Sequence, residues 1–325
     1  MPNSIMQSLL VTNNPEAILG SNRFRNARHR LCEHILRKDF AGYWICKGPP
    51  TEIQTTKQFD KILIHIHGGG YIAGHPLGSL AQFLRVSELA AEQNLVLGIF
   101  ALHYSLGPKA KFPQQTKQAV AAFRYLIEEL YISPRNIILE GDSAGGHLAL
   151  SMLVELSRQG LPRPGGCILI YPWVNLNNSG ASFQRNKFRD ILNKKDLDHA
   201  ASEVLGEHGR VEFAHICNFS IPRERKWAQI LPRTWVSTGT DDCFVDDIVA
   251  FVENARSDGA EVSMQFATGK AHAWLTFDDA WDIRVYCQQE PSADLKNIMQ
   301  GASHIFKGLS DILHFEGHNY TAHDK

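Results

Sequence analysis

The segment ILEGDSAGGHLAL, residues 138–150, limits what this chain can fold into more than any other stretch. Apolar residues lead into GDSAG, residues 141–145, and a helix-forming run follows directly. Glycine in a regular element costs backbone entropy, so glycines on both sides of a serine indicate a backbone that bends tightly there. The pattern Gly-x-Ser-x-Gly between a strand and a helix is typical of a turn that lifts the serine hydroxyl above the edge of a sheet.

Ser143 would then lie at the N-terminus of the predicted helix, where backbone N–H groups favour developing negative charge. Its hydroxyl is therefore a candidate nucleophile. For the pentapeptide alone, the structural alternative is a tight strand-to-helix turn with a serine cap. The neighbouring Asp142 is expected to be structural, because its side chain should point away from that of Ser143.

Apolar runs and amphipathic segments alternate along most of the chain. Strands are predicted at 61–66, 95–104, 136–140, 166–171, 234–238 and 262–266, and helices at 80–93, 114–130, 146–159, 247–257 and 294–309. The strand segments are nearly continuous in apolar residues, as in strands buried on both faces of a parallel sheet. Repeated strand–helix units predict an α/β fold with helices on both faces of the sheet.

Two segments break this alternation. Residues 1–50 show weak helical spacing of apolar residues and many charges, so we expect an N-terminal helical segment outside the sheet. Residues 175–225 are polar, with basic clusters and a helical segment at 196–205, and are predicted to form an insertion. The α/β core is then expected to comprise 51–174 and 226–325.

A glycine triplet follows the predicted strand 61–66 in the sequence HGGG, residues 67–70. Consecutive glycines expose backbone N–H groups, which can hold the negative charge of a tetrahedral intermediate. We predict the N–H groups of Gly69, Gly70 and Ala144 as the donors of such an oxyanion hole, and we expect His67 to brace the glycine loop. A purely structural glycine turn is the alternative, but it would not explain the pairing with the turn at Ser143.

HGGG followed by GDSAGG resembles the hormone-sensitive-lipase-like family of α/β-hydrolase carboxylesterases, over about residues 61–274. The fungal members are the most similar, through YSLGPKAKFPQQTKQAV (104–120), YPWV (171–174) and DDCFVDDI (241–248). The resemblance implies an α/β-hydrolase fold, with a mostly parallel eight-stranded sheet and a helical cap made from segments 1–50 and 175–225. Many members carry Tyr-Arg-Leu-Ala-Pro-Glu where this chain has YSLGPK, a segment that supports the glycine loop.

A serine hydroxyl is a poor nucleophile without a base in hydrogen-bond reach and an acid that orients this base. In the fold implied here the chain order is serine, then acid, then histidine. His272 follows the predicted strand 262–266 and lies in the correct order, so we predict it as the base. His147 is one helical turn after Ser143 and should point away. Histidines that precede the serine are in the wrong order, among them His65, His67, His75 and His103.

The acid is expected in the loop after the predicted strand 234–238. The family pattern places an acid, then a large apolar residue two positions on, then a second acid after two more. Asp242, Phe244 and Asp246 match it, so the resemblance implies Asp242 as the acid that orients His272. Asp241 is the rival.

The charge balance and the cysteine content limit the classes of partner and the compartment that we expect for this chain. The chain has 325 residues with 33 basic and 34 acidic side chains, a balance that argues against nucleic acid or an anionic membrane as the main partner. No segment approaches the run of about 18 apolar residues that spans a membrane. The six cysteines are scattered without a Cys-x-x-Cys pair, which favours free thiols and a cytoplasmic protein. Residues 1–20 lack the basic start and apolar run of a secretory signal.

The residues and the resemblance together imply a serine carboxylesterase without cofactor or metal. The expected substrate is a small to medium hydrophobic ester with a short acyl chain, such as a secondary metabolite. Trp173, Trp274 and Phe244 would line an apolar pocket, with core packing as their alternative role. The same residues would also suit acyl transfer, lactone formation or amide hydrolysis, and a ligand receptor on the same fold is a further alternative. Edge strands of such sheets often pair, so a homodimer is expected.

Overall fold

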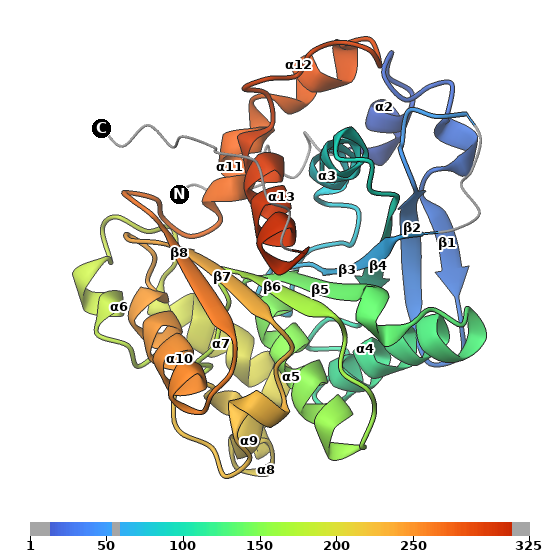
Figure 1. Ribbon diagram of the computed structural model, residues 1–325. Helices are drawn as coiled ribbons and strands as arrows, with labels where there is room; N and C mark the ends of the chain where they lie inside the picture. Colours follow the sequence, from blue (N-terminus) through green and yellow to red (C-terminus); the bar gives the residue numbers. More distant parts are fainter. Residues whose placement is uncertain (1–13, 54–58, 314–325) are drawn as a thin grey trace.

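The computed structural model describes residues 14–53 and 59–313 (Figure 1). The first residues of segment 1–50, with most of the stretch on which the expectation about a secretory signal depends, lie outside the described residues. Among the helices of the described ranges, we find none with the length and apolar character that crossing a membrane requires.

An eight-stranded sheet runs through the described part of the molecule in the order β1-β2-β4-β3-β5-β6-β7-β8. Its strands are β1 (Glu33–Leu36), β2 (Ala41–Lys47), β3 (Lys61–Ile66), β4 (Leu97–His103), β5 (Ile137–Asp142), β6 (Gly166–Ile170), β7 (Thr234–Gly239) and β8 (Val262–Ala267). β4, β3 and β5 to β8 run parallel to one another, whereas β2 pairs antiparallel with β1 and β4. This confirms the predicted fold, a mostly parallel sheet with helices.

Apolar side chains on both faces of the central strands explain their nearly continuous apolar sequences. Along β3, Ile62 and Ile64 belong to one buried cluster, and Leu63 between them belongs to a second. Successive side chains of a strand point to opposite faces, so each cluster lies on one side of the sheet.

Helices cover both faces of the sheet (Figure 1). In the described residues, the α-helices outside the insertion are α2 (Pro15–Leu19), α3 (Leu80–Glu92), α4 (Gln114–Arg124), α5 (Ala144–Arg158), α10 (Val245–Ser257), α11 (Trp274–Ala280), α12 (Ile283–Gln288) and α13 (Gln300–Leu313). The apolar cluster of Leu63 contains residues of α3 and α13, and that of Ile62 contains residues of α4, α5 and α10.

The predicted insertion 175–225 is helical and packs on the same side as α5. It carries α6 (Ser182–Arg185), α7 (Lys194–Leu205), α8 (Gly209–Glu212) and α9 (Ala214–Cys217). The side chain of Asn193 caps α7 by accepting the N–H of Asp196 at 3.1 Å, and Gly206 ends the helix with φ 74°. Leu197, Ala201 and Val204 of α7 join the buried cluster that also holds residues of α5.

The prediction that residues 1–50 lie outside the sheet is wrong for residues 33–47. β1 and β2 form the antiparallel edge of the sheet, in the register Glu33 with Trp44. An edge strand is buried on one face only, so β1 shows a single buried residue, Ile35, among exposed ones. The helical spacing seen there in the sequence instead spans a short 3₁₀ turn, Arg28–Arg30, and the first strand.

The predicted start of the last helix is also too early. Residues 294–299 precede α13, which begins at Gln300. The carboxylate of Asp279 accepts the N–H groups of Gly301 at 2.6 Å and Ala302 at 2.9 Å. A carboxylate from another helix therefore satisfies the free donors at this helix start, which local sequence cannot indicate.

Candidate active site

Ser143 lies at the turn between β5 and α5, at the carboxyl end of a central strand. Its backbone has φ 52° and ψ −118°, a combination that non-glycine residues rarely adopt. Main-chain hydrogen bonds hold it from both sides, from Ser143 N–H to Ile170 O at 3.0 Å and from Trp173 N–H to Ser143 O at 2.9 Å. The side chain makes no cap hydrogen bond, so the alternative of a serine that merely caps α5 does not describe this turn.

The flanking glycines are required by close contacts of the backbone. A Cβ on Gly145 would lie 1.8 Å from the carbonyl oxygen of Ile66 in β3. A Cβ on Gly141 would lie 2.5 Å from the carbonyl oxygen of Gly145. Real atoms cannot approach so closely, and these two glycines therefore let α5 begin directly beside the strands and hold Ser143 on the bend.

His272 connects the serine to a buried carboxylate. Its Nε2 lies 2.8 Å from Oγ of Ser143, and its Nδ1 lies 2.9 Å from Oδ2 of Asp242. The tautomer that uses both contacts donates its Nδ1–H to Asp242 and leaves Nε2 to accept the serine proton. The other carboxylate oxygen of Asp242 accepts the N–H of Phe244 at 2.7 Å. The structure thus brings Ser143, Asp242 and His272 into one continuous chain of hydrogen bonds.

Burial and charge act in opposite directions on the pKa of His272. Burial disfavours the imidazolium, but the charge and hydrogen bond of Asp242, with the charges of Asp190 and Asp142, raise the pKa of His272 above its ordinary value. Asp242 is fully buried, and this raises the pKa of its carboxyl, while the charge of His272 acts against that shift. The surroundings therefore favour a positive charge on the imidazole.

The side chain of the rival, Asp241, pairs with an arginine and not with the histidine. Its side chain is partly exposed and forms an ion pair with Arg189 at 3.4 Å. Only its backbone contacts the histidine loop, through a hydrogen bond from its N–H to Lys270 O at 3.0 Å. Of the two neighbouring aspartates, Asp242 is therefore the one whose side chain meets His272.

The glycine loop leaves β3 directly beside the turn at Ser143, because Ile66 of β3 pairs with Gly141 of β5. Gly69 and Gly70 have φ 107° and 62°, values that favour glycine. Asp142 accepts the N–H of Gly68 at 2.9 Å and so ties the glycine loop to the turn, a structural role as expected. Ala144, the third predicted donor, is the first residue of α5.

Side chains behind the glycine loop hold it in place. The ring of His67 stacks on Tyr104 with 4.3 Å between centroids, and the Tyr104 hydroxyl donates to His67 O at 2.8 Å. Nδ1 of His147 lies 2.7 Å from the hydroxyl of Tyr71, and its Nε2 lies 2.9 Å from Ile216 O in the insertion. Both ring nitrogens of His147 are thus occupied away from Ser143.

The predicted pocket aromatics differ in their surroundings. Trp173 and Phe244 are buried and stack with 6.0 Å between their centroids, and Phe244 also lies edge-on to the His272 ring at 4.9 Å. Trp274 contacts His304 with 4.7 Å between centroids. These contacts agree with the alternative of core packing, which for Phe244 includes packing against His272.

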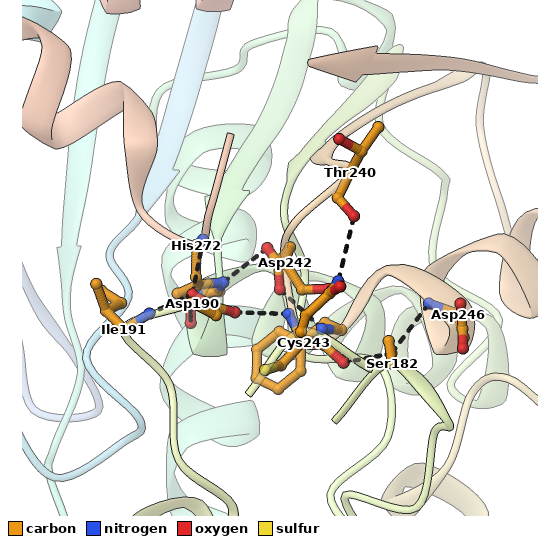
Figure 2. A network of polar contacts seen from close by, with 11 residues as sticks. Ser182, Asp190, Ile191, Thr240, Asp242, Cys243, Asp246 and His272 are labelled. Carbon is orange, nitrogen blue, oxygen red and sulfur yellow. Dashed lines mark hydrogen bonds and ion pairs between the residues drawn. The ribbon is translucent and has the colours of Figure 1, made fainter. Parts of the chain in front are cut away.

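Sequence reasoning missed a group of residues from the insertion that contact both loops of the site. Asp190 lies between His272 and Cys243 and accepts a main-chain N–H from each (Figure 2). Ser182 and Asn186 donate to carbonyl oxygens of the loop that carries Asp242. No signal in the polar stretch around 175–225 distinguishes these side chains from solvated ones.

Comparison with known proteins gives matches over most of the chain. The family described as alpha/beta hydrolase fold matches residues 63–276. An acetyl-hydrolase of Streptomyces hygroscopicus is 30% identical over 68% of this chain and 71% of its own length. An acetyl esterase of Salmonella schwarzengrund is 29% identical over 66% of each chain. Among solved structures, an esterase from the bacterial hormone-sensitive lipase family shares the fold, with a TM-score of 0.67, 21% identity, and coverage of 94% of this chain and 98% of that chain.

Proposed function

This chain belongs to the alpha/beta hydrolase fold family, and on that premise we propose that it is a serine carboxylesterase in which Ser143 attacks the ester carbonyl. The observation that carries the proposal is the chain of hydrogen bonds from Ser143 through His272 to Asp242, at a strained turn beside a glycine loop. Relatives named as an acetyl-hydrolase and an acetyl esterase support ester hydrolysis as the reaction.

Each side chain has a defined step in this reaction. His272 accepts the proton of Ser143 as Oγ attacks the carbonyl carbon, and Asp242 stabilises the resulting imidazolium. The N–H groups of Gly69, Gly70 and Ala144 would hold the oxyanion of the tetrahedral intermediate. His272 then protonates the leaving alcohol, and water, deprotonated by the same histidine, releases the acid from Ser143. Both half-reactions use only groups of the chain, water and the ester.

A short acyl chain is the proposed specificity, and its support is the position of α7. A Cβ on Gly70 of the glycine loop would lie 3.6 Å from Cβ of Ala200 in α7. The same helix is tied to the core by a hydrogen bond from Phe112 N–H to Val204 O at 2.9 Å. We propose that segment 175–225, with the part of 1–50 outside the sheet, forms a cap over the site. A helix held close to the glycine loop would leave little room for a long acyl group.

The predicted ester substrate remains a secondary metabolite. This prediction rests on the family resemblance, and the relatives described above are bacterial. A cytoplasmic location and a homodimer likewise stay predictions.

We expect p-nitrophenyl acetate to butyrate to be hydrolysed fastest in a series from acetyl to decanoyl. The leaving group is constant across this series, so differences in kcat/KM report the acyl pocket. The decanoyl ester should be slower by at least about tenfold, because a pocket that rejects methylenes discriminates on this scale. An optimum at the long esters would contradict the proposed pocket while leaving the reaction type in place.

The pH dependence of kcat/KM should follow His272. The base must be neutral to accept the serine proton, so the rate falls as the pH drops through the pKa of His272. Because Asp242 and the other carboxylates raise this pKa, the acid limb should lie above the ordinary histidine value of 6.5. Measurement of kcat/KM for p-nitrophenyl acetate across pH checks this, and a limb at or below 6.5 would show that the carboxylates do not act on the base as described.

A further inference from the structure

Asp190 links the two loops that carry the proposed acid and base. Its Oδ1 accepts the N–H of His272 at 3.0 Å, and its Oδ2 accepts the N–H of Cys243 at 2.5 Å. Oδ1 also accepts the N–H of the next residue, Ile191, at 2.6 Å. One half-buried carboxylate thus fixes the main chain of His272 and the main chain directly after Asp242 (Figure 2).

The segment that carries Asp190 is itself fastened to the loop of Asp242. Nδ2 of the buried Asn186 donates to Asp242 O at 2.9 Å and to Thr240 O at 3.2 Å. The buried hydroxyl of Ser182 donates to Cys243 O at 2.6 Å. These bonds, with those of Asp190, join residues 182–190 of the insertion to main-chain carbonyl and N–H groups within residues 240–243.

The charge of Asp190 also acts on the histidine. Three carboxylates surround His272: Asp242 on Nδ1, Asp190 on the backbone N–H, and Asp142 beneath the glycine loop. All three favour the imidazolium electrostatically. The basic side chains near these loops face other partners, because Arg189 pairs with Asp241 and Lys270 pairs with Asp278.

We propose that Asp190 is a positioning residue of the proposed esterase, which holds the loop of His272 against the loop of Asp242 through one main-chain N–H group of each. This inference rests on the proposed function. It assigns part of the active-site machinery to the insertion, beyond any role of that segment in shaping a pocket.

The test is Asp190→Asn, assayed with p-nitrophenyl acetate across pH beside the wild type. An asparagine side chain has nearly the shape of aspartate but carries no charge. Its amide NH₂ group replaces one carboxylate oxygen, so a hydrogen-bond donor then faces a main-chain N–H that the oxygen had accepted. We expect kcat to fall about tenfold or more through misplacement of the base, with little change in KM. The acid limb of kcat/KM should move to lower pH, because a charge that favours the imidazolium is gone. A merely structural residue would not move that limb.

Asp246→Asn is the matched control. It also removes one carboxylate charge, from the first turn of α10 next to the loop of Asp242, but Asp246 pairs with Arg185 and does not contact His272. Its kcat and acid limb should equal those of the wild type. Asp142, with a pKa raised by burial to about 6, titrates in the same range in all these proteins, so the readout is the difference between variants.

Asp190→Glu keeps the charge, so its acid limb should lie closer to the wild-type position than that of Asp190→Asn. If Asp190→Asn fails to fold, Asp190→Ser serves as a second neutral variant. Unchanged kcat, or reduced kcat with an unmoved acid limb in a folded neutral variant, would overturn the inference. A wild type that neither hydrolyses esters nor reacts with a fluorophosphonate at Ser143 would instead contradict the proposed function itself.

Discussion

Ser143→Ala should reduce kcat/KM for p-nitrophenyl acetate by about 10⁴-fold or more, because removal of the nucleophile leaves only binding and the oxyanion hole to act. The substitution is small, and the hydroxyl of Ser143 makes no cap hydrogen bond, so the fold should be unaffected. The protein should keep its circular dichroism spectrum and melting temperature while turnover is lost.

Ser310→Ala is the control for this variant. Ser310 lies in α13, where its hydroxyl donates to Phe306 O at 3.0 Å, far along the chain from the turn. This variant should retain wild-type turnover. If Ser143→Ala also retains turnover, the ester is cleaved elsewhere, and the assignment of Ser143 as nucleophile is wrong.

Asp242→Asn should lower kcat by about 10⁴-fold, since an amide in place of the buried carboxylate favours the wrong tautomer of His272 and no longer stabilises its positive charge. Asp241→Asn is the natural partner for this test, because it makes the same change one residue earlier. Asp241 forms only a partly exposed ion pair with Arg189, so kcat should stay within about twofold of the wild type.

Steady-state kinetics of both asparagine variants decide between the two aspartates. A large loss in Asp241→Asn with a small one in Asp242→Asn would reverse the assignment. Comparable large losses in both would indicate that the loop as a whole has moved, which circular dichroism and thermal unfolding of the two proteins would reveal.

The central strands could be predicted because burial on both faces requires nearly continuous runs of apolar residues, which are a strong signal in the sequence. β3 is predicted at 61–66 and observed at Lys61–Ile66. β1 carries a weaker signal, because it is the edge strand and only Ile35 of its residues is buried. β2 lies between β1 and β4, and its partner β4 is far along the chain. Secondary-structure propensity over a short window could not distinguish these two strands from helices outside the sheet. Pairing with other strands determined their structure.

The candidate site was partly predictable for a similar reason. The glycines around Ser143 are imposed by local contacts, such as that between Gly145 and Ile66, and chain order then selects a late histidine. Asp190 could not be predicted, since it acts through main-chain N–H groups of residues 53 and 82 positions later. Asp190 accepts hydrogen bonds from backbone N–H groups, which nearly every residue type carries. Its contacts therefore leave no pattern in the sequence at the positions that it contacts.

The most direct measurement of the central claim is mass-spectrometric mapping of the folded wild-type protein after reaction with a fluorophosphonate. We predict a single adduct per chain, on the peptide that contains Ser143, and its absence from Ser143→Ala. Such a result would show that this serine is an activated nucleophile. No adduct, or an adduct on another residue, would contradict the account and favour a ligand receptor on the same fold.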